Sequence, residues 1–239
     1  MKAFCIQLFI QFRSDLRDKG VLMVYYLVPM AFYLIMGSIM KTLEMDSGNS
    51  LILSITIFAL SMSAFLGMPQ TLVKARENGV LVAYRVAGIP SWSLPLATIM
   101  ISFVHMMIVA IIILFSAHYL FDAAWPADIL LYLFSVAIIA ICSEALGALL
   151  SCLVKKQSTL TLVGQLLFLP TVMFSGIMFP SNLLPKPMQL IGEILPATQG
   201  LRLITENGFQ VIPLLMLITM AVIAFMIAII LYRRISVRS

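Results

Sequence analysis

Six long apolar stretches constrain the fold of this chain more than any other feature of its sequence. An α-helix needs about 20 apolar residues to cross the hydrocarbon core of a bilayer. The stretches reach this length and are Val21–Met40, Leu51–Thr71, Leu94–Ala117, Ile129–Leu153, Leu160–Phe179 and Val211–Tyr232. Only 10% of the residues are charged, whereas soluble domains carry about 25%. We therefore expect an all-α integral membrane protein with six transmembrane helices, forming a single domain over residues 1–239.

Lysine and arginine are distributed unevenly between the segments that flank these stretches. The N-terminal segment, the connections after the second and fourth stretches and the C-terminal segment together hold twelve of the fifteen basic residues. The remaining connections hold only Lys41, Lys186 and Arg202. Because cytoplasmic segments of membrane proteins are enriched in basic residues, we expect both termini in the cytoplasm. The basic residues form no continuous stripe, so a nucleic-acid partner is not expected.

The first 20 residues precede the apolar stretches and carry a different pattern. Wound into a helix, this segment places apolar and polar side chains on opposite faces. The apolar face comprises Phe4, Cys5, Leu8, Phe9, Phe12 and Leu16, and the polar face comprises Gln7, Gln11, Ser14 and Asp18. Charged residues precede the first stretch and no small-residue cleavage site follows it, so a cleavable signal peptide is not expected. We predict an amphipathic helix over residues 1–20 that lies in the membrane interface.

Residues 72–93 form the longest connection on the side predicted to be cytoplasmic. Charged residues, two glycines and Pro90 mark this connection as a segment that does not span the bilayer. The Asn78–Gly79 pair is a turn signal, and it predicts a short helix over Val80–Val86.

Residues 180–210 form the longest connection on the opposite side, and they are too apolar for a solvated loop. Proline favours the first turn of a helix and glycine favours the position after its end. This pattern predicts two short helices, over Pro187–Leu195 and Thr198–Asn207. We expect them to be re-entrant helices between the fifth and sixth spans, dipping into the outer leaflet without crossing it.

Motifs of several enzyme and metal-binding classes are absent from the sequence. The 239 residues contain no G-x-x-x-x-G-K-[ST] phosphate loop, no H-E-x-x-H zinc motif and no G-x-S-x-G nucleophile elbow. The cysteines Cys5, Cys142 and Cys152 have no metal-ligand spacing. We therefore expect no metal site and no cofactor held by this chain.

Glu144 and His105 are ionisable residues inside the fourth and third apolar stretches. A charged group at the centre of a span costs about 2.5–3.5 kcal/mol on insertion scales, so such a residue is a candidate functional site. Two interpretations of Glu144 stay open: it lines a substrate pathway or contacts another subunit, or it packs between helices with a hydrogen-bond partner. For His105, packing and proton transfer are the alternatives, and no acid lies near it in the sequence.

Three sequence features together resemble one known family. The first is an N-terminal amphipathic segment before six spans, and the second is Arg76-Glu77-Asn78-Gly79-Val80-Leu81 with a downstream Pro90-Ser91. The third is Phe174-Ser175-Gly176-Ile177-Met178-Phe179-Pro180, followed by Leu184-Pro185 and Leu195-Pro196-Ala197-Thr198. Over essentially its whole length the chain resembles the permease subunits of type-2 ABC exporters. It departs from the family pattern at Val80, where threonine is usual.

The resemblance implies a function and a set of site residues. A separate ATPase subunit would bind ATP and Mg²⁺ and dock on Arg76, Glu77, Gly79, Leu81 and Tyr84. An outer gate would include Ser175, Gly176, Pro180, Pro185 and Pro196. Two permease subunits, identical or different, would export an amphiphilic drug, antibiotic, peptide, lipid or glycan across the plasma membrane, which is the inner membrane in bacteria.

Two alternatives to an exporter stay open at this point. An intramembrane enzyme would use Glu144 and His105. A non-transporting membrane protein for immunity or assembly would need neither these residues nor ATP.

Overall fold

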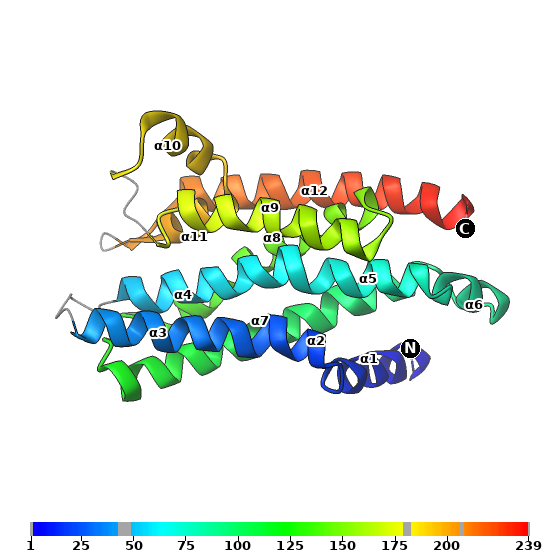
Figure 1. Ribbon diagram of the computed structural model, residues 1–239, viewed down its shortest axis with the longest axis horizontal. Helices are drawn as coiled ribbons and strands as arrows, with labels where there is room; N and C mark the ends of the chain where they lie inside the picture. Colours follow the sequence, from blue (N-terminus) through cyan, green and yellow to red (C-terminus); the bar gives the residue numbers. More distant parts are fainter. Residues whose placement is uncertain (1, 43–48, 179–182, 206–207, 239) are drawn as a thin grey trace.

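The chain forms an elongated helical bundle (Figure 1). The computed structural model describes residues 2–42, 49–178, 183–205 and 208–238. In chain order, the helices are α1 (Lys2–Asp15), α2 (Lys19–Leu22), η1 (Met23–Leu27), α3 (Val28–Thr42), α4 (Asn49–Met62), η2 (Ser63–Gly67), α5 (Met68–Glu77), α6 (Val80–Val86), α7 (Ser93–Phe121), α8 (Ile129–Leu153), α9 (Gln157–Phe174), α10 (Lys186–Glu193), α11 (Pro196–Leu203) and α12 (Val211–Arg238). Here η1 and η2 are wider, π-helical turns within longer helices.

The six predicted spans are confirmed as helices within the described part of the chain. Six helical stretches there are long and apolar enough to cross a membrane. They are Lys19–Ile39, Ile52–Glu77, Ser93–Phe121, Ile129–Leu153, Gln157–Phe174 and Val211–Ile235. The charges around Lys74 suggested the start of a loop, but the second span continues as helix because Leu72 and Val73 are buried.

The structure corrects the predicted bounds of two further helices, the fifth span and the second of the two short helices that follow it. The fifth span ends at Phe174 and not at Phe179, since Gly176 turns the backbone to a φ of 95°. The helix predicted over Thr198–Asn207 begins earlier and ends at Leu203. There the chain leaves the helix to pair β1 (Ile204–Thr205) antiparallel with β2 (Gly208–Phe209).

The connections rich in basic residues gather at one end of the bundle. In Figure 1, α6 and both chain termini lie towards the right-hand end, while α10, α11 and the start of α4 lie towards the left. At the left-hand end, Lys41 forms an ion pair with Asp122 at 2.7 Å, and Arg202 pairs with Glu193. Two of the three basic residues predicted for that side are thus partly neutralised within the chain.

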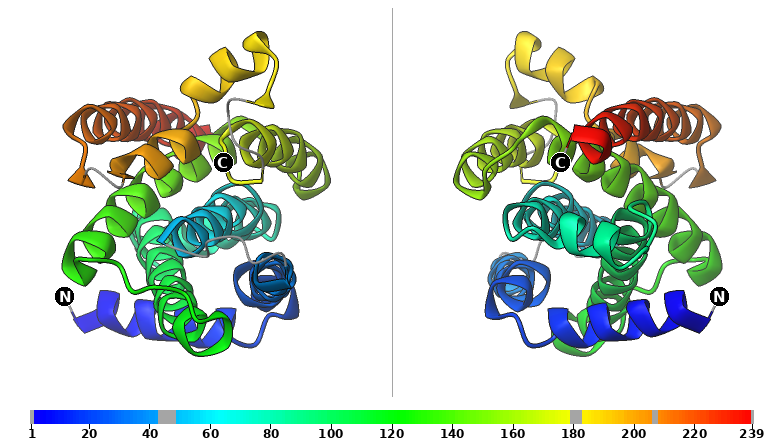
Figure 2. Two further views of the ribbon diagram at one scale, coloured as in Figure 1. Left: turned by 90° about the vertical axis from the view of Figure 1, so that its left-hand side faces the viewer. Right: turned by 90° about the vertical axis from the view of Figure 1, so that its right-hand side faces the viewer.

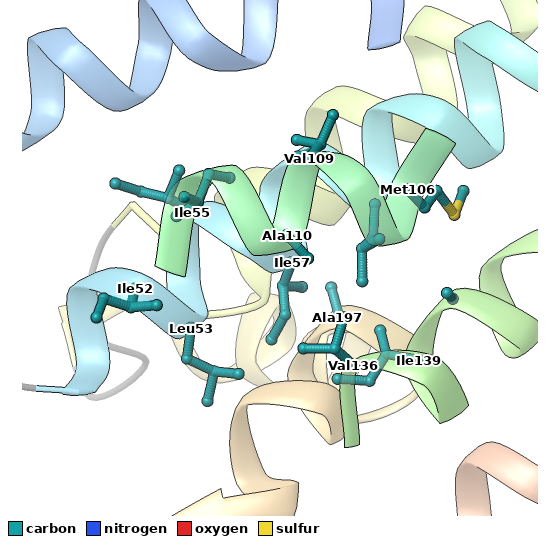
Figure 3. Packing of buried hydrophobic residues seen from close by; sticks show 14 of the residues in the cluster. Ile52, Leu53, Ile55, Ile57, Met106, Val109, Ala110, Val136, Ile139 and Ala197 are labelled. Carbon is teal, nitrogen blue, oxygen red and sulfur yellow. The ribbon is translucent and has the colours of Figure 1, made fainter. Parts of the chain in front are cut away.

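The main hydrophobic core lies between α4, α7 and α8, and α11 closes it (Figure 3). Ile57 of α4, Ala110 of α7 and Ile139 of α8 are fully buried there, and Ala197 of α11 packs among them. A methyl group added at Gly200 would lie only 3.0 Å from Ile139. Small residues therefore let α11 approach the long helices closely.

The wide turn η2 is packed between two glycines of neighbouring helices. A Cβ atom at Gly147 of α8 would lie 2.6 Å from the carbonyl oxygen of Ala64. One at Gly164 of α9 would lie 2.5 Å from the carbonyl oxygen of Phe65. Both helices therefore touch the backbone of η2 directly, as small residues permit in membrane bundles.

Helix α1 lies across the bundle at a large angle to the long helices (Figure 2). It packs on α7, and the side facing the protein shares only Phe4, Leu8 and Phe12 with the predicted apolar face. The residues turned inward are Phe4, Gln7, Leu8, Gln11, Phe12 and Asp15. Phe9 and Leu16, predicted to share the apolar face, are 66% and 43% exposed. Polar groups on α7 and α6, described below, explain why three polar side chains of α1 turn inward.

Candidate functional site

The predicted helix over Val80–Val86 is present as α6, joined to the end of the second span by a sharp elbow. Gly79 forms the bend with a left-handed φ of 71°, and a side chain there would meet no atom within 4 Å. The far end of α6 closes with a Schellman motif, in which Ile89 donates its backbone N–H to the Tyr84 carbonyl at 2.8 Å. The elbow is thus fixed at both ends by backbone geometry.

One side of α6 packs on the bundle and the other projects from it. Leu81 is buried against Met68, Leu72 and Leu94, so it anchors the helix. Val82 and Val86 lie on the outer side, and Val86 is 85% exposed. An exposed valine at the tip of a protruding helix is suited to contact another protein. Sequence reasoning did not single out Val82 or Val86, although their spacing relative to Leu81 would have placed them outside.

Arg76 and Glu77 bind the ends of neighbouring spans. The Arg76 guanidinium donates a hydrogen bond to the backbone carbonyl of Ser151, near the end of α8. The Glu77 carboxylate accepts a 3.2 Å hydrogen bond from the backbone N–H of Gln157, the first residue of α9. These contacts tie the elbow to the connection between α8 and α9. Movement of α6 would therefore be passed on to three spans.

Helix α1 is fastened to the same elbow. Gln7 donates to the Tyr84 hydroxyl at 3.4 Å and to the Ser93 carbonyl at 3.2 Å. Lys74 forms a 2.8 Å ion pair with Asp18, and this contact lowers the pKa of the Asp18 carboxyl. Of the residues predicted for docking, Arg76, Glu77, Gly79, Leu81 and Tyr84 thus all lie in one elbow.

A second constellation surrounds His105 on α7, where sequence reasoning found no acid. The Tyr26 hydroxyl lies 2.6 Å from His105 Nδ1. The Phe12 ring stacks on the imidazole with centroids 5.0 Å apart, and an Asp15 carboxylate oxygen lies 3.8 Å from Nε2. Burial raises the pKa of Asp15 from 3.8 to about 6. The acid comes from α1, which is 90 residues away in sequence, so no local pattern marked it.

Glu144 lies in the same layer of the bundle, joined through α7. Ser102, one helical turn from His105, donates to the Glu144 carboxylate at 2.5 Å. The Ser102 oxygen in turn accepts from the Tyr25 hydroxyl at 2.7 Å. Tyr25 also contacts the His105 ring, with centroids 5.2 Å apart. The structure therefore brings the two predicted intramembrane residues into one polar cluster.

This polar cluster keeps two atoms without a hydrogen-bond partner among the described residues. They are His105 Nε2 and one carboxylate oxygen of Glu144, and both are buried. The described residues contain no group of three His, Cys, Asp or Glu side chains able to hold a metal ion. Chemically, the polar cluster can hold or pass protons and can pair helices. The rings of Phe12, Tyr25 and Tyr26 pack around His105, and Glu144 is only 1% exposed.

Four of the five predicted gate residues lie in described segments, and Pro180 lies outside them. Ser175 is buried at the end of α9, and Gly176 follows it. Pro185 is the N-cap of α10, and Pro196 begins α11. Gly176 and Pro185 therefore lie in the connection before α10, and Pro196 lies between α10 and α11, as their backbone preferences favour.

The short helices form a fixed unit. A Cβ atom at Gly192 of α10 would lie 2.4 Å from the Phe174 carbonyl oxygen, so α10 sits on the end of α9. Arg202 of α11 binds the Glu193 carboxylate through both of its terminal nitrogens, which lowers the pKa of Glu193. The buried Gln199 donates to the Glu193 carbonyl at 2.6 Å.

Comparison with known proteins decides the family. A family model described as ABC-2 type transporter matches residues 2–209. The chain belongs to the ABC-2 type transporter family. Its relatives include the linearmycin resistance permease protein LnrN of Bacillus subtilis (strain 168), which is 31% identical over 159 residues. Another is YvfS of the same organism, which is provisionally named as a transport permease. It is 24% identical to this chain over 192 residues.

The ABC-2 alignments differ in their extent. The match covers 78% of this chain and 78% of YvfS. With LnrN it covers 64% of this chain, which spans only 40% of the length of LnrN. The family and both relatives' names describe transport proteins and not enzymes, so neither an intramembrane enzyme nor a non-transporting immunity or assembly factor is favoured.

Proposed function

We propose that this chain is the membrane subunit of an ATP-binding-cassette exporter. A separate ATPase subunit binds ATP and Mg²⁺ and docks on α6. The exported molecule is amphiphilic, such as a drug, antibiotic, peptide, lipid or glycan. LnrN is named for resistance to linearmycin, which supports an antibiotic or another membrane-active molecule within this class.

The observation that carries the proposal is the elbow between α5 and α6. A membrane subunit driven by another protein needs a rigid protrusion that receives force and passes it to the spans. Helix α6 presents Val82 and Val86 outward, while Leu81 and the Gly79 bend hold it on the second span. The contacts of Arg76 and Glu77 extend the connection to α8 and α9.

The distribution of basic residues supports a placement with both termini in the cytoplasm. The end of the bundle that carries α6 and the termini is the basic end, and cytoplasmic ends are basic. In this placement α1 lies in the cytoplasmic interface and turns Phe9 and Ile10, both at least 60% exposed, towards lipid. Its inward polar residues attach it to the elbow.

At the opposite end, α10 and α11 serve as re-entrant helices. Helix α11 is buried among the long helices, whereas Leu190 of α10 and Ile194 just after it are 69% and 71% exposed. Exposed apolar groups beside a buried helix suit a segment that enters the outer leaflet. We propose that this unit gates the outer end of a pathway between two permease subunits.

A substitution on the outer side of α6 tests the coupling role. Val86→Asp places a charge on an 85% exposed residue of α6 without disturbing the packing of Leu81. We expect co-purification with the ATPase subunit to fall at least about tenfold, because burying an unpaired charge in an interface costs about 2–5 kcal/mol. The measurement is the amount of ATPase that co-purifies with the tagged chain from membranes.

Ile194→Asp is the matched control, since Ile194 is a similarly exposed aliphatic residue at the other end of the bundle. It should leave the co-purified ATPase unchanged. Equal recovery with Val86→Asp and with the unmodified chain would show that α6 is not the docking element.

A further inference from the structure

A groove separate from the polar cluster opens between α7 and α12, close to the elbow. It has a volume of about 650 Å³, within the range of about 300–1,000 Å³ typical of small-molecule sites. Its walls include Trp92, Leu96, Ile99, Phe225, Ala228 and Ile229. Leu96 and Ile229 are 40% and 53% exposed, so the groove is open on the surface of the spans. We call it the α7–α12 groove.

Polar contacts hold the walls of the α7–α12 groove in place. At its end towards α6, the Tyr232 hydroxyl donates to the Ser91 carbonyl at 2.8 Å. Farther along, the Cys152 thiol lies 3.7 Å from the Ala228 carbonyl, joining α8 to α12. Ser151, whose carbonyl binds Arg76, also lines the groove. The groove is therefore part of the fixed framework around the elbow.

The α7–α12 groove ends at a positive charge. Phe225, Ile229 and Arg233 follow one another at intervals of four residues along one face of α12. Arg233 is the only charged residue among the described residues that line the groove. No ion pair holds Arg233 within the described part of the chain. An apolar slot thus leads to an available guanidinium, and Trp92 lines the same groove.

We propose that the α7–α12 groove binds an anionic diacyl phospholipid, with an acyl chain along the apolar walls and the phosphate at Arg233. A guanidinium pairs with phosphate in two-point hydrogen bonds, and basic sites between spans select anionic headgroups. A zwitterionic lipid fits the apolar walls equally well, but its headgroup gains less binding free energy at Arg233. The inference rests on the membrane placement of the proposed function and not on ATPase docking.

The two tryptophans of the chain make the proposal measurable. Trp92 lies at the α7–α12 groove, while Trp125 packs on Phe115 near the opposite end of α7. With Trp125→Phe as background, Trp92 is the only indole in the protein. The protein is reconstituted in phosphatidylcholine vesicles that contain a minor fraction of phosphatidylglycerol brominated in its acyl chain. Bromine quenches an indole only at short range, so quenching reports occupancy next to Trp92.

We expect brominated phosphatidylglycerol to associate with the site about fivefold more strongly than brominated phosphatidylcholine, the gain typical of one arginine near an anionic surface. Arg233→Gln should abolish this preference. Arg234→Gln is the matched control, because Arg234 is the adjacent exposed arginine and does not line the groove. It should retain most of the preference.

Ala228→Phe provides a second variant that fills the α7–α12 groove. It should reduce quenching of Trp92 by both brominated lipids. Equal quenching by the two lipids in the unmodified chain would overturn the headgroup assignment, as would a preference that survives Arg233→Gln. If Ala228→Phe leaves the quenching of Trp92 by both brominated lipids unchanged, then no lipid chain occupies the groove. All these measurements are made without ATPase, so they stand apart from the test on α6.

Discussion

At the scale of single residues, the polar cluster joins side chains that the sequence keeps far apart. Asp15 approaches His105 from α1, and Glu144 reaches Ser102 from α8. Both carboxyl groups lie next to polar partners, because burying a polar group without a hydrogen-bond partner costs free energy. Asp15 also sits near Asp18, a like charge that further raises its pKa, while Gln11 donates to it and lowers the pKa. Burial outweighs both effects.

Asp15→Asn should stabilise the protein at neutral pH. Because the folded pKa of Asp15 is raised from 3.8 to about 6, the folded state binds its proton more tightly than the unfolded chain. Stability therefore decreases as the pH rises from 3.8 to about 6, and the loss persists at pH 7. Removing the carboxyl should recover about 1–3 kcal/mol at pH 7 and nothing near pH 4. Thermal unfolding of the detergent-solubilised protein at both pH values measures this.

Asp18→Asn is the control, since the pKa of Asp18 is lowered by Lys74 and its charge is favourable in the fold. It should not stabilise the protein at pH 7. If Asp15→Asn proves less stable than the unmodified chain at pH 7, then the Asp15 carboxylate is held as a favourable anion by His105, and burial does not dominate.

At the scale of elements, sequence patterns predict some features well and others not at all. The spans and α6 follow from local signals, namely apolar length and the Asn78–Gly79 turn. The inward face of α1 does not, because apolar residues occur around most of its circumference and only the partners on α6 and α7 select a face. The wide turn η2 has no sequence signal either, and neither do the contacts of Arg76 and Glu77 with α8 and α9.

Gly164→Ala should destabilise the protein more than Gly79→Ala. At Gly164 the added methyl would lie 2.5 Å from the Phe65 carbonyl oxygen, a backbone atom that cannot rotate away. We expect a loss at or above the upper end of the usual range for overpacking, about 3 kcal/mol or more. At Gly79 space is free, and only the left-handed backbone opposes alanine, at a cost of about 1–2 kcal/mol.

The comparison of these glycine variants uses the thermal unfolding midpoint in detergent. The two substitutions should also differ in function, because Gly79→Ala alters the elbow angle while Gly164→Ala loosens the packing of α9 on η2. If Gly164→Ala destabilises the protein no more than Gly79→Ala does, then α9 can shift away from η2 at little cost in free energy.

At the scale of the whole molecule, the two ends of the bundle differ in charge. The end with α6 carries most of the basic residues, which the sequence already indicated. The structure adds that at the other end Lys41 and Arg202 pair with Asp122 and Glu193. At the α6 end Lys74 likewise pairs with Asp18, so the proposed orientation rests on the number of basic residues at each end.

Cysteine labelling in intact cells tests that orientation. Cys5 is exposed on α1 and serves as a reporter for the basic end once Cys142 and Cys152 are replaced by alanine. Lys186→Cys, combined with Cys5→Ala, reports the opposite end from an exposed polar position at the start of α10. A membrane-impermeant maleimide should label the Lys186→Cys variant in intact cells and Cys5 only after permeabilisation, because basic segments are retained in the cytoplasm. The reverse pattern would place α6 outside the cell, where no ATP-driven partner could dock, and would refute the exporter proposal together with the placement.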